Sequence, residues 1–322
     1  MSFEGNKIVK KISIMTPCYN EQGNVEELYL RVKDVCSQLT NYEYEHIFID
    51  NASTDRTVEQ LRYIAQKDPN VTVIVNARNF GPIRSGYYGL LQCYGDLVIP
   101  IVADLQDPPE MILDFVKKWE EGYRVVKAVK TPMKEGFFFY YARQIYYWLI
   151  DNLADIKISR NFTGFGLYDQ SVLEILRQIN DPYPYFRGLI EELGFESYTF
   201  QYQQRQRTRG ISSYNFFRYF EEAMLGITSH SRVPLRVATV AGFTMSLLSL
   251  LIAIGYLVAK LLFWQSFPVG TAPIMVGFFF LASVQLFFIG VIGEYIGLMH
   301  MRILKRPLVV ERERINFPKN NI

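Results

Sequence analysis

The sequence predicts an α/β fold with a Rossmann-like, mostly parallel sheet, followed by interfacial helices and two transmembrane helices. Three observations lead to this prediction: short apolar strands alternate with helical segments of 10 to 15 residues, polar clusters follow the strands, and the last third contains two long uncharged runs. Such alternation is typical of βαβ units with helices on both faces of a parallel sheet. Hydrophobic residues make up 49% of the 322 residues and charged residues only 20%, and the C-terminal runs hold the apolar excess.

The central strand is expected at residues 97–102, where five of six residues are apolar. A continuous apolar run fits a strand that is buried on both faces. The chain then becomes acidic and amide-rich at Asp104 and Gln106, before Pro108 and Pro109 open a helix. Ligands of open α/β sheets bind at the carboxyl ends of the strands, so Asp104 and Gln106 are candidates to hold a cation and, through it, a diphosphate. The alternative is that Asp104 only caps a turn.

The remaining elements follow in order on either side of this strand. Asn24 and Glu27 are spaced as a capping box at the start of the first helix. The pattern of apolar residues predicts strands at 11–16, 44–49, 71–75 and 125–129, and helices at 24–39, 55–67, 82–93 and 109–120.

Three polar clusters, at residues 17–21, 50–55 and 76–81, follow the first three strands. Because the carboxyl ends of parallel strands meet at one edge, we expect these clusters to converge. Asp50 could accept hydrogen bonds from a ribose or base, Tyr19 could stack, and turn amides could bind phosphate. A plain loop is the better explanation for any one cluster taken alone, but together they favour a nucleotide site.

The C-terminal third predicts a membrane hairpin. Residues 237–259 and 261–293 carry no charge, and each run exceeds the roughly 20 residues needed to cross a bilayer. We therefore expect spans at about 237–263 and 273–299, the alternative being a buried hairpin in a soluble core. Basic residues flank the hairpin and are absent from its link at 264–270, so both termini are expected in the cytoplasm. The basic residues are Arg232, Arg236, Arg302, Lys305 and Arg306.

Two further stretches, 137–148 and 214–229, mix aromatic or apolar residues with charges and are expected as interfacial helices. Surface helices packed on the sheet are the alternative. Residues 1–10 are polar, which argues against a signal peptide. The three cysteines lack paired spacing, as in a reducing compartment, and the three scattered histidines argue against a zinc site. A net charge of +2 gives no indication of a nucleic-acid partner.

Six motifs carry a resemblance to a known family. They are Pro17-Cys18-Tyr19-Asn20-Glu21, the segment from Asp50 to Asp55, Ala77-Arg78-Asn79-Phe80-Gly81, the segment from Ala103 to Glu110, Phe186-Arg187-Gly188-Leu189, and Gly293-Glu294-Tyr295-Ile296-Gly297. With these motifs the chain resembles family 2 glycosyltransferases of the polyprenyl-phosphate type, such as dolichol-phosphate mannose synthase and bacterial undecaprenyl-phosphate glucosyltransferases. The resemblance implies a GT-A fold, a nucleotide-sugar donor, most simply a UDP-sugar, a Mg²⁺ or Mn²⁺ ion, and a lipid phosphate acceptor in the membrane.

The resemblance also implies roles for individual residues. The metal would be held by Asp104 and Gln106, and the catalytic set would be Asp104, Lys130, Arg143 and Arg207. The nucleotide sugar would be bound by Pro17, Tyr19, Asn20, Glu21, Asp50, Arg78, Asn79 and Asp104. It further implies an inverting enzyme of the cell envelope, multi-pass in the inner membrane and homo-oligomeric, with a catalytic domain at 1–212, an interfacial helix and linker at 213–236, the hairpin at 237–300 and a cytoplasmic tail at 301–322.

The implied chemistry needs positive charge more than a base. A polyprenyl phosphate is already an anion at neutral pH, so its oxygen can attack the anomeric carbon without a general base. Cationic groups are needed on the leaving diphosphate and on the acceptor phosphate. The metal would serve the diphosphate, and Lys130, Arg143 and Arg207 would serve the acceptor. Arg143 could instead be an ordinary solvated helix charge.

Several positions depart from the family pattern. Val102 stands where the family usually has a first aspartate, so the metal would have fewer charged ligands. Asn51 and Ala52 follow Asp50 where Asp-Gly is usual, Pro82 and Ser213 replace basic residues, and 163–166 lacks an acid that is often present. These changes indicate a subfamily with another sugar or a weakened catalyst. Two other hypotheses therefore stay open: a transferase acting on another membrane lipid such as diacylglycerol, and a non-catalytic membrane scaffold or transporter component that retains the fold.

Overall fold

The computed structural model describes residues 9–131, 159, 161–179, 181–205, 224–226, 228–229, 231, 233–262, 271–304 and 306–317. The chain forms two compact units. The first comprises Met1–Ala142, Ile158–Phe216 and Leu304–Ile322, and the second Arg143–Lys157 and Phe217–Ile303.

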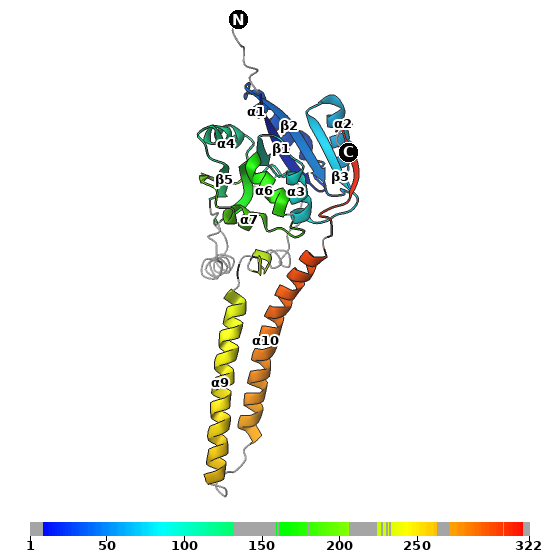
Figure 1. The fold of residues 1–322 in the computed structure, drawn as a ribbon. Helices are drawn as coiled ribbons and strands as arrows, with labels where there is room; N and C mark the ends of the chain where they lie inside the picture. The colour runs from blue at the N-terminus through cyan, green and yellow to red at the C-terminus, as the bar shows by residue number, and fades with distance from the viewer. Residues whose placement is uncertain are drawn as a thin grey trace. The chain divides into compact units, whose positions relative to one another are not determined.

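The first unit contains, within the described residues, an eight-stranded sheet in the order β7-β5-β6-β4-β1-β2-β3-β8 (Figure 1). Neighbours β4-β1-β2-β3 are parallel, as are β5 and β7, whereas β6 runs antiparallel to β4 and β5, and β8 antiparallel to β3. The strands are β1 Lys10–Cys18, β2 Tyr42–Asp50, β3 Val71–Asn76, β4 Leu97–Pro100, β5 Val125–Lys130, β6 Phe162–Asp169, β7 Ser197–Tyr202 and β8 Glu311–Ile315.

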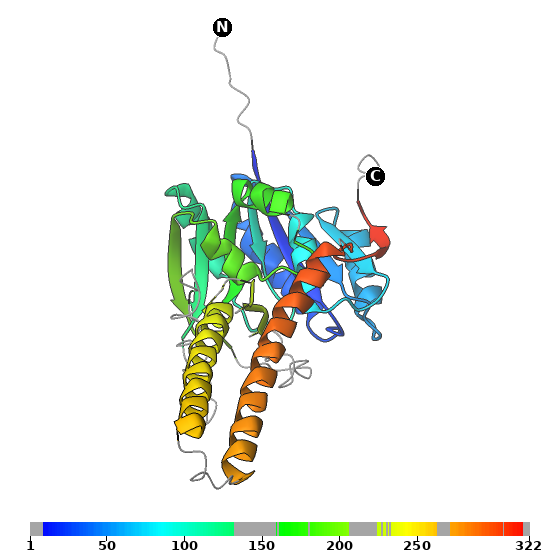
Figure 2. The same cartoon turned by 60° about the horizontal axis from the view of Figure 1, so that its bottom comes forward.

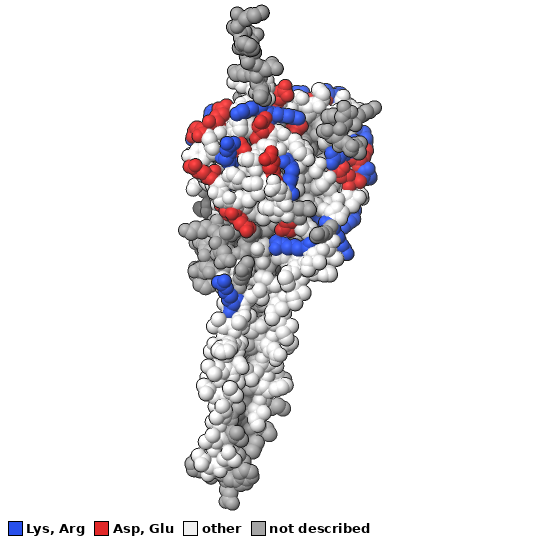
Figure 3. All heavy atoms as spheres, in the orientation of Figure 1, with Lys and Arg blue, Asp and Glu red and all other residues white. Residues whose placement is uncertain are grey.

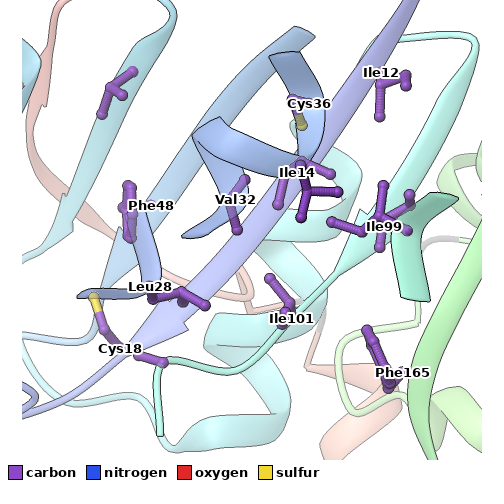
Figure 4. Packing of buried hydrophobic residues seen from close by; sticks show 14 of the residues in the cluster. Ile12, Ile14, Cys18, Leu28, Val32, Cys36, Phe48, Ile99, Ile101 and Phe165 are labelled. Atoms are coloured by element: carbon purple, nitrogen blue, oxygen red, sulfur yellow. The ribbon is translucent and has the colours of Figure 1, made fainter. Parts of the chain in front are cut away.

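Helices cover both faces of this sheet and bury two apolar clusters. The helices α1 Val25–Ser37, α2 Thr57–Lys67 and α4 Met111–Glu120 contribute to one cluster, and α3 Pro82–Leu91, α6 Gln170–Ile179 and α7 Phe186–Glu192 to the other. Figure 4 shows Leu28 and Val32 of α1 lying against strand residues such as Ile14 and Phe48. Helical residues spaced three or four apart supply these contacts, as an amphipathic helix requires.

The strands and helices expected up to residue 130 are confirmed, with ends that shift by a few residues. The central strand, for example, ends at Pro100 rather than at 102. The expected capping box is wrong. Asn24 makes no side-chain cap: its Oδ1, the atom that would accept a backbone N–H, has no hydrogen-bond partner among the described residues, and its Nδ2 donates to the Glu21 carboxylate.

Strands β6 and β7 lie outside the sequence prediction. β6 holds two glycines that the chain geometry requires: Gly164 has φ of +99°, and a Cβ on Gly166 would lie 2.1 Å from the Val126 carbonyl oxygen. Glycine is depleted in strands generally, so such a segment does not look like a strand in the sequence. Here it allows two backbones to approach closely.

Strand β8 is a second departure, because a separate tail is expected at 301–322 whereas residues 311–315 belong to the sheet. Figures 1 and 2 show it at the sheet edge, in red. Side-chain contacts fasten it there: Glu313 pairs with Arg62 at 2.8 Å, and Glu311 accepts from the Tyr88 hydroxyl at 2.6 Å. Its exposed, charge-rich side chains blunt the open edge that β3 would otherwise present.

The second unit contains two long helices that run side by side, α9 Val233–Leu262 and α10 Thr271–Ile303 (Figures 1 and 2). The Tyr295 hydroxyl of α10 donates to the Ser231 carbonyl oxygen at 2.6 Å. By length and composition both could cross a membrane, over Val233–Ile252 and Phe280–Ile303, and none of these window residues is buried. Exposure of the windows disfavours a buried hairpin in a soluble core, and Figure 3 shows the uncharged helix surface. The stretch 137–148 and residues 214–223 lie outside the described residues.

Candidate active site

The polar clusters that follow β1, β2 and β3 converge at one edge of the sheet, as expected. Cys18 of β1 lies opposite Asp50 of β2 in the parallel register, and Asp50 lies opposite Val75 of β3. The first two loops are then tied together directly. The Asn20 amide N–H donates to the Ser53 hydroxyl at 2.8 Å, and the Asn20 side chain accepts from the Thr54 N–H at 2.8 Å.

Asp50 is completely buried, and its carboxylate holds its own loop. Its Oδ2 accepts from the Ser53 N–H at 2.9 Å, and its Oδ1 accepts from the Ser53 hydroxyl. Burial raises the pKa of Asp50, while the bonds from Ser53 and the charge of Arg312 oppose that rise. Both oxygens are therefore engaged within the protein, and a direct contact of Asp50 with a nucleotide stays a prediction.

An asparagine network that the sequence did not single out joins the second and third loops. The Asn51 Nδ2 donates to the Asn79 Oδ1 at 2.9 Å, and the Asn51 Oδ1 accepts from the Asn76 side chain and the Phe80 N–H. Asn79 also accepts from the Gly81 N–H at 2.8 Å. Asn51 occupies one of the positions that depart from the family pattern, so this chain uses the departure to fix the loop after β3.

The exposed groups at this edge are those that a ligand could reach. Tyr19, Asn20, Arg78 and Asn79 are exposed, whereas Pro17 and Glu21 are half-buried. The Arg78 guanidinium lies 4.1 Å from the centre of the Phe80 ring, which holds the cation in place by a cation–π contact. A planar guanidinium in this setting suits a phosphate.

Asp104 sits in the loop after β4 and is only half-buried. Its Oδ1 accepts from the Gln106 N–H at 3.1 Å, around Leu105, which has φ of +60°. Asp104 therefore does cap a turn, as one of the two alternatives requires. Within the described part of the chain its Oδ2 has no hydrogen-bond partner, so the same carboxylate keeps an oxygen for a ligand.

A divalent cation fits these residues only with help from a substrate. Asp104 offers one carboxylate, whereas the Gln106 Oε1 already accepts from the Gln204 Nε2 at 3.3 Å, and Val102 is 38% exposed where the family has an acid. Among the described residues no group of three or more His, Cys, Asp or Glu side chains could hold a metal ion. Mg²⁺ is commonly bound by one or two carboxylates together with substrate phosphates, and this set is compatible with that mode.

Lys130 at the end of β5 belongs to a second cluster beside this loop. Lys130 pairs in register with Tyr202 of β7, and the Tyr202 hydroxyl donates to the buried Asp107 carboxylate. Burial lowers the pKa of Lys130, against the opposing charges of Asp107 and Asp104. Burial raises the pKa of Asp107, against the charge of Lys130 and the bond from Tyr202. Asp107 was missed as a site residue although it lies inside the most specific motif.

Arg143 and Arg207 lie outside the described residues, but the chain just before Arg207 is anchored at the Asp104 loop. The Arg205 N–H donates to the Gln106 carbonyl oxygen at 3.2 Å, and the Gln106 side chain donates back to the Arg205 carbonyl oxygen at 3.2 Å. Gln204 adds a bond to the Gln106 Oε1 at 3.3 Å. These bonds fix the backbone at Arg205, two residues before Arg207 in the sequence.

Comparisons with known proteins agree on one family. Residues 13–177 match the family model described as Glycosyl transferase family 2. The chain is 36% identical to an uncharacterized glycosyltransferase, YkcC, of Bacillus subtilis over 92% of both proteins. It is 33% identical to the bactoprenol glucosyl transferase of Shigella phage SfII, over 92% of this chain and 96% of that protein. A solved mannosyltransferase from Pyrobaculum calidifontis, in complex with GDP-Man and Mn²⁺, is 16% identical with a TM-score of 0.48, over 92% of this chain and 86% of that one.

Proposed function

Because the chain belongs to glycosyltransferase family 2, we propose that it transfers a sugar from a nucleotide-sugar donor to a polyprenyl phosphate at a membrane, with inversion at the anomeric carbon. It is a glycosyltransferase with a GT-A-like fold, a mostly parallel sheet with helices on both faces. The similarity to bactoprenol glucosyl transferases, 33% identity over 92% of this chain, supports the choice of acceptor. A UDP-sugar is the donor that we propose.

The site residues support a division of labour between donor and acceptor. Tyr19, Asn20, Arg78 and Asn79 are exposed around the donor position, and Asp104 and Gln106 would hold a divalent cation at the diphosphate. Such a cation neutralises charge on the leaving diphosphate. Lys130 would face the acceptor phosphate from the other side of the Asp104 loop. Burial lowers the pKa of Lys130, but the charges of Asp107 and Asp104 raise it and so favour the ammonium form, which can bind an anion.

We further propose that Arg143 and Arg207 complete this acceptor site. The hydrogen bonds between Gln106 and Arg205 support the proposal for Arg207, because they hold the chain two residues away beside the proposed metal ligand. An anionic acceptor gives up hydration when it enters such a site, and charge-assisted hydrogen bonds compensate for that loss.

The two apolar helices support attachment to a membrane, and we propose the inner membrane with the catalytic unit and both termini in the cytoplasm. The basic residues before α9 and after α10 favour this orientation. A cysteine introduced at position 266 (Ser266→Cys) should react with a membrane-impermeant reagent added to intact cells. Labelling that occurs only after lysis would reverse the orientation.

The decisive experiment is a product assay with purified full-length protein. We would supply a panel of UDP- and GDP-sugars, Mg²⁺ or Mn²⁺, and either undecaprenyl phosphate or diacylglycerol, and identify extracted lipids by mass spectrometry. We expect a glycosylated undecaprenyl phosphate that forms far more slowly with the Asp104→Ala variant. A glycosylated diacylglycerol would identify the other lipid class, and no product with any donor would favour the non-catalytic alternative.

A further inference from the structure

Three arginines gather at one place in the first unit, next to the loop after β3. Arg78 and Arg84 share the ring of Phe80, with guanidinium carbons 4.1 Å and 5.5 Å from its centre. Arg84 also donates from Nη2 to the Pro307 carbonyl oxygen at 2.6 Å, which brings Arg306 into the group. We call Arg78, Arg84 and Arg306 the arginine cluster.

No carboxylate within the described residues balances the positive charge of this cluster. Among the described residues none of the three forms an ion pair with a carboxylate, whereas Arg31, Arg62 and Arg124 elsewhere in the unit all do. The Arg84 Nε is buried and has no hydrogen-bond acceptor. Burial lowers the pKa of Arg84, and the neighbouring charges of Arg78 and Arg306 lower it further.

The position of Arg84 in the fold adds to this imbalance. Arg84 lies in the first turn of α3, where the helix dipole presents its positive end and disfavours a cation. The repulsion of Arg84 by Arg78 and Arg306, its buried N–H donor without an acceptor, and its place at the positive end of a helix are all relieved by one ligand of negative charge. Guanidinium groups bind phosphate through paired hydrogen bonds, so a phosphate is the anion that this chemistry suits.

The source of the phosphate follows from the distance along the chain to α10. That helix and its apolar window both end at Ile303, three residues before Arg306. Three residues reach at most about 11 Å, so if α10 crosses a bilayer the backbone of Arg306 lies within about 11 Å of the hydrocarbon boundary, and its long side chain can reach back to the headgroups. Basic groups at this depth on the cytoplasmic side attract anionic lipids.

We propose that Arg84 and Arg306 of the arginine cluster bind the phosphate of an anionic phospholipid headgroup, beside the exposed Arg78 of the proposed donor site. This goes beyond the proposed transfer reaction, because the lipid would be neither donor nor acceptor. It rests on α10 being a membrane span. Bound there, the headgroup would neutralise Arg84 and Arg306 and secure the segment between α10 and β8.

The test compares lipid retention by two full-length double variants. Arg84→Gln with Arg306→Gln removes two charges of the cluster, and Arg56→Gln with Lys117→Gln removes two exposed charges elsewhere as the matched control. Native mass spectrometry from neutral detergent, with phosphatidylglycerol or phosphatidylcholine added, measures the affinity for each lipid. We expect the cluster variant to bind phosphatidylglycerol about tenfold or more weakly, and the control to match wild type. Equal retention by the cluster variant and wild type would overturn the proposal.

Two further measurements separate the possible phosphates. The affinity for UDP, measured by calorimetry, and the KM for undecaprenyl phosphate should both be unchanged in the cluster variant. A loss of UDP affinity would assign the cluster to the donor diphosphate, and a raised acceptor KM would assign it to the acceptor, and either result would overturn the lipid proposal. The single variant Arg306→Gln, which alters an exposed side chain, should show a smaller loss of phosphatidylglycerol and serves if the double variant does not fold.

Discussion

The loops after β2 and β4 each carry an aspartate at the carboxyl end of a parallel strand, yet the two carboxylates are in different states. Asp50 is fully buried, and Ser53 occupies both of its oxygens. Asp104 is half-buried, and Gln106 occupies only one of its oxygens. The residue type and its place in the sheet are the same, so neither distinguishes a carboxylate that supports a loop from one that is open to a ligand. The two carboxylates differ in whether an oxygen remains without a hydrogen-bond donor among the described residues: Asp104 has one, and Asp50 has none.

The strongest test of this contrast is the Asp104→Ala variant. We expect its turnover with lipid acceptor to fall on the order of 10²–10³-fold, because it removes the charged ligand of the proposed cation at the diphosphate. Initial rates over a metal titration measure the effect, and circular dichroism checks the fold. Asp114→Ala, which removes an exposed aspartate of α4, is the control and should match wild type. Near-normal, EDTA-resistant turnover of Asp104→Ala would show that Asp104 is not a ligand of a catalytic cation.

The contribution of the buried residues of β2 to stability can be tested by changing the pH. His46 is buried on β2, bonds Thr16 through Nε2 at 2.9 Å and stacks on Phe48, and burial lowers its pKa to about 3. Between pH 6.5 and about 3 the unfolded state binds the proton and the folded state does not, so stability falls as pH falls. From pH 7 to pH 5 the loss should be roughly 2 kcal/mol. Urea titrations should show a smaller loss for His46→Gln, and equal slopes for both proteins would contradict this reading.

The next effect concerns the proposed acceptor site beside the Asp104 loop. We expect Arg207→Ala and Arg143→Ala each to lower turnover with lipid acceptor on the order of tenfold, while donor affinity measured by calorimetry changes little. Arg207→Lys should recover only part of the rate, because an ammonium cannot present the planar fork of a guanidinium. If both alanine variants lost donor binding and kept a normal dependence on lipid, the two arginines would belong to the diphosphate site instead.

The smallest expected effect is on the Asp50 side. Ser53→Ala removes the hydroxyl that donates to the Asp50 carboxylate and accepts from the Asn20 N–H, and should lower the free energy of unfolding by about 1 kcal/mol. Turnover should stay within about twofold of wild type if the carboxylate only supports its loop. Urea denaturation and steady-state kinetics measure the two quantities. A tenfold rise in donor KM at unchanged stability would show that this loop acts on the donor directly.

Much of the fold could be predicted from the sequence because the first 130 residues follow regular local rules. Apolar strands alternate with amphipathic helices there, and parallel pairing then brings the strand ends together. Strand β6 escaped prediction because Gly164 and Gly166 serve long-range packing against β5, which no local pattern reveals. Strand β8 escaped because its sequence, Glu-Arg-Glu-Arg-Ile, looks like a solvated tail until it pairs with β3.

The site divides in the same way. The motifs identified Asp104 and its loop. They did not show that Asp50 is buried and that its carboxylate accepts the Ser53 N–H. Asp107 and Tyr202 are 95 residues apart, and only the sheet order brings them together. Hydrogen bonds between such distant residues leave no spacing in the sequence, so the network behind Lys130 could not be predicted.

The pairing of β3 with β8 also sets an order of events during synthesis. Val73 lies opposite Ile315, and both apolar helices are translated between them. At roughly 5–20 residues per second, the ribosome needs on the order of tens of seconds to make that interval. During this time the β3 edge is open to pairing with other nascent chains, and the sheet closes only after the second apolar helix has been made. Completion of the sheet therefore waits for the synthesis of both apolar helices.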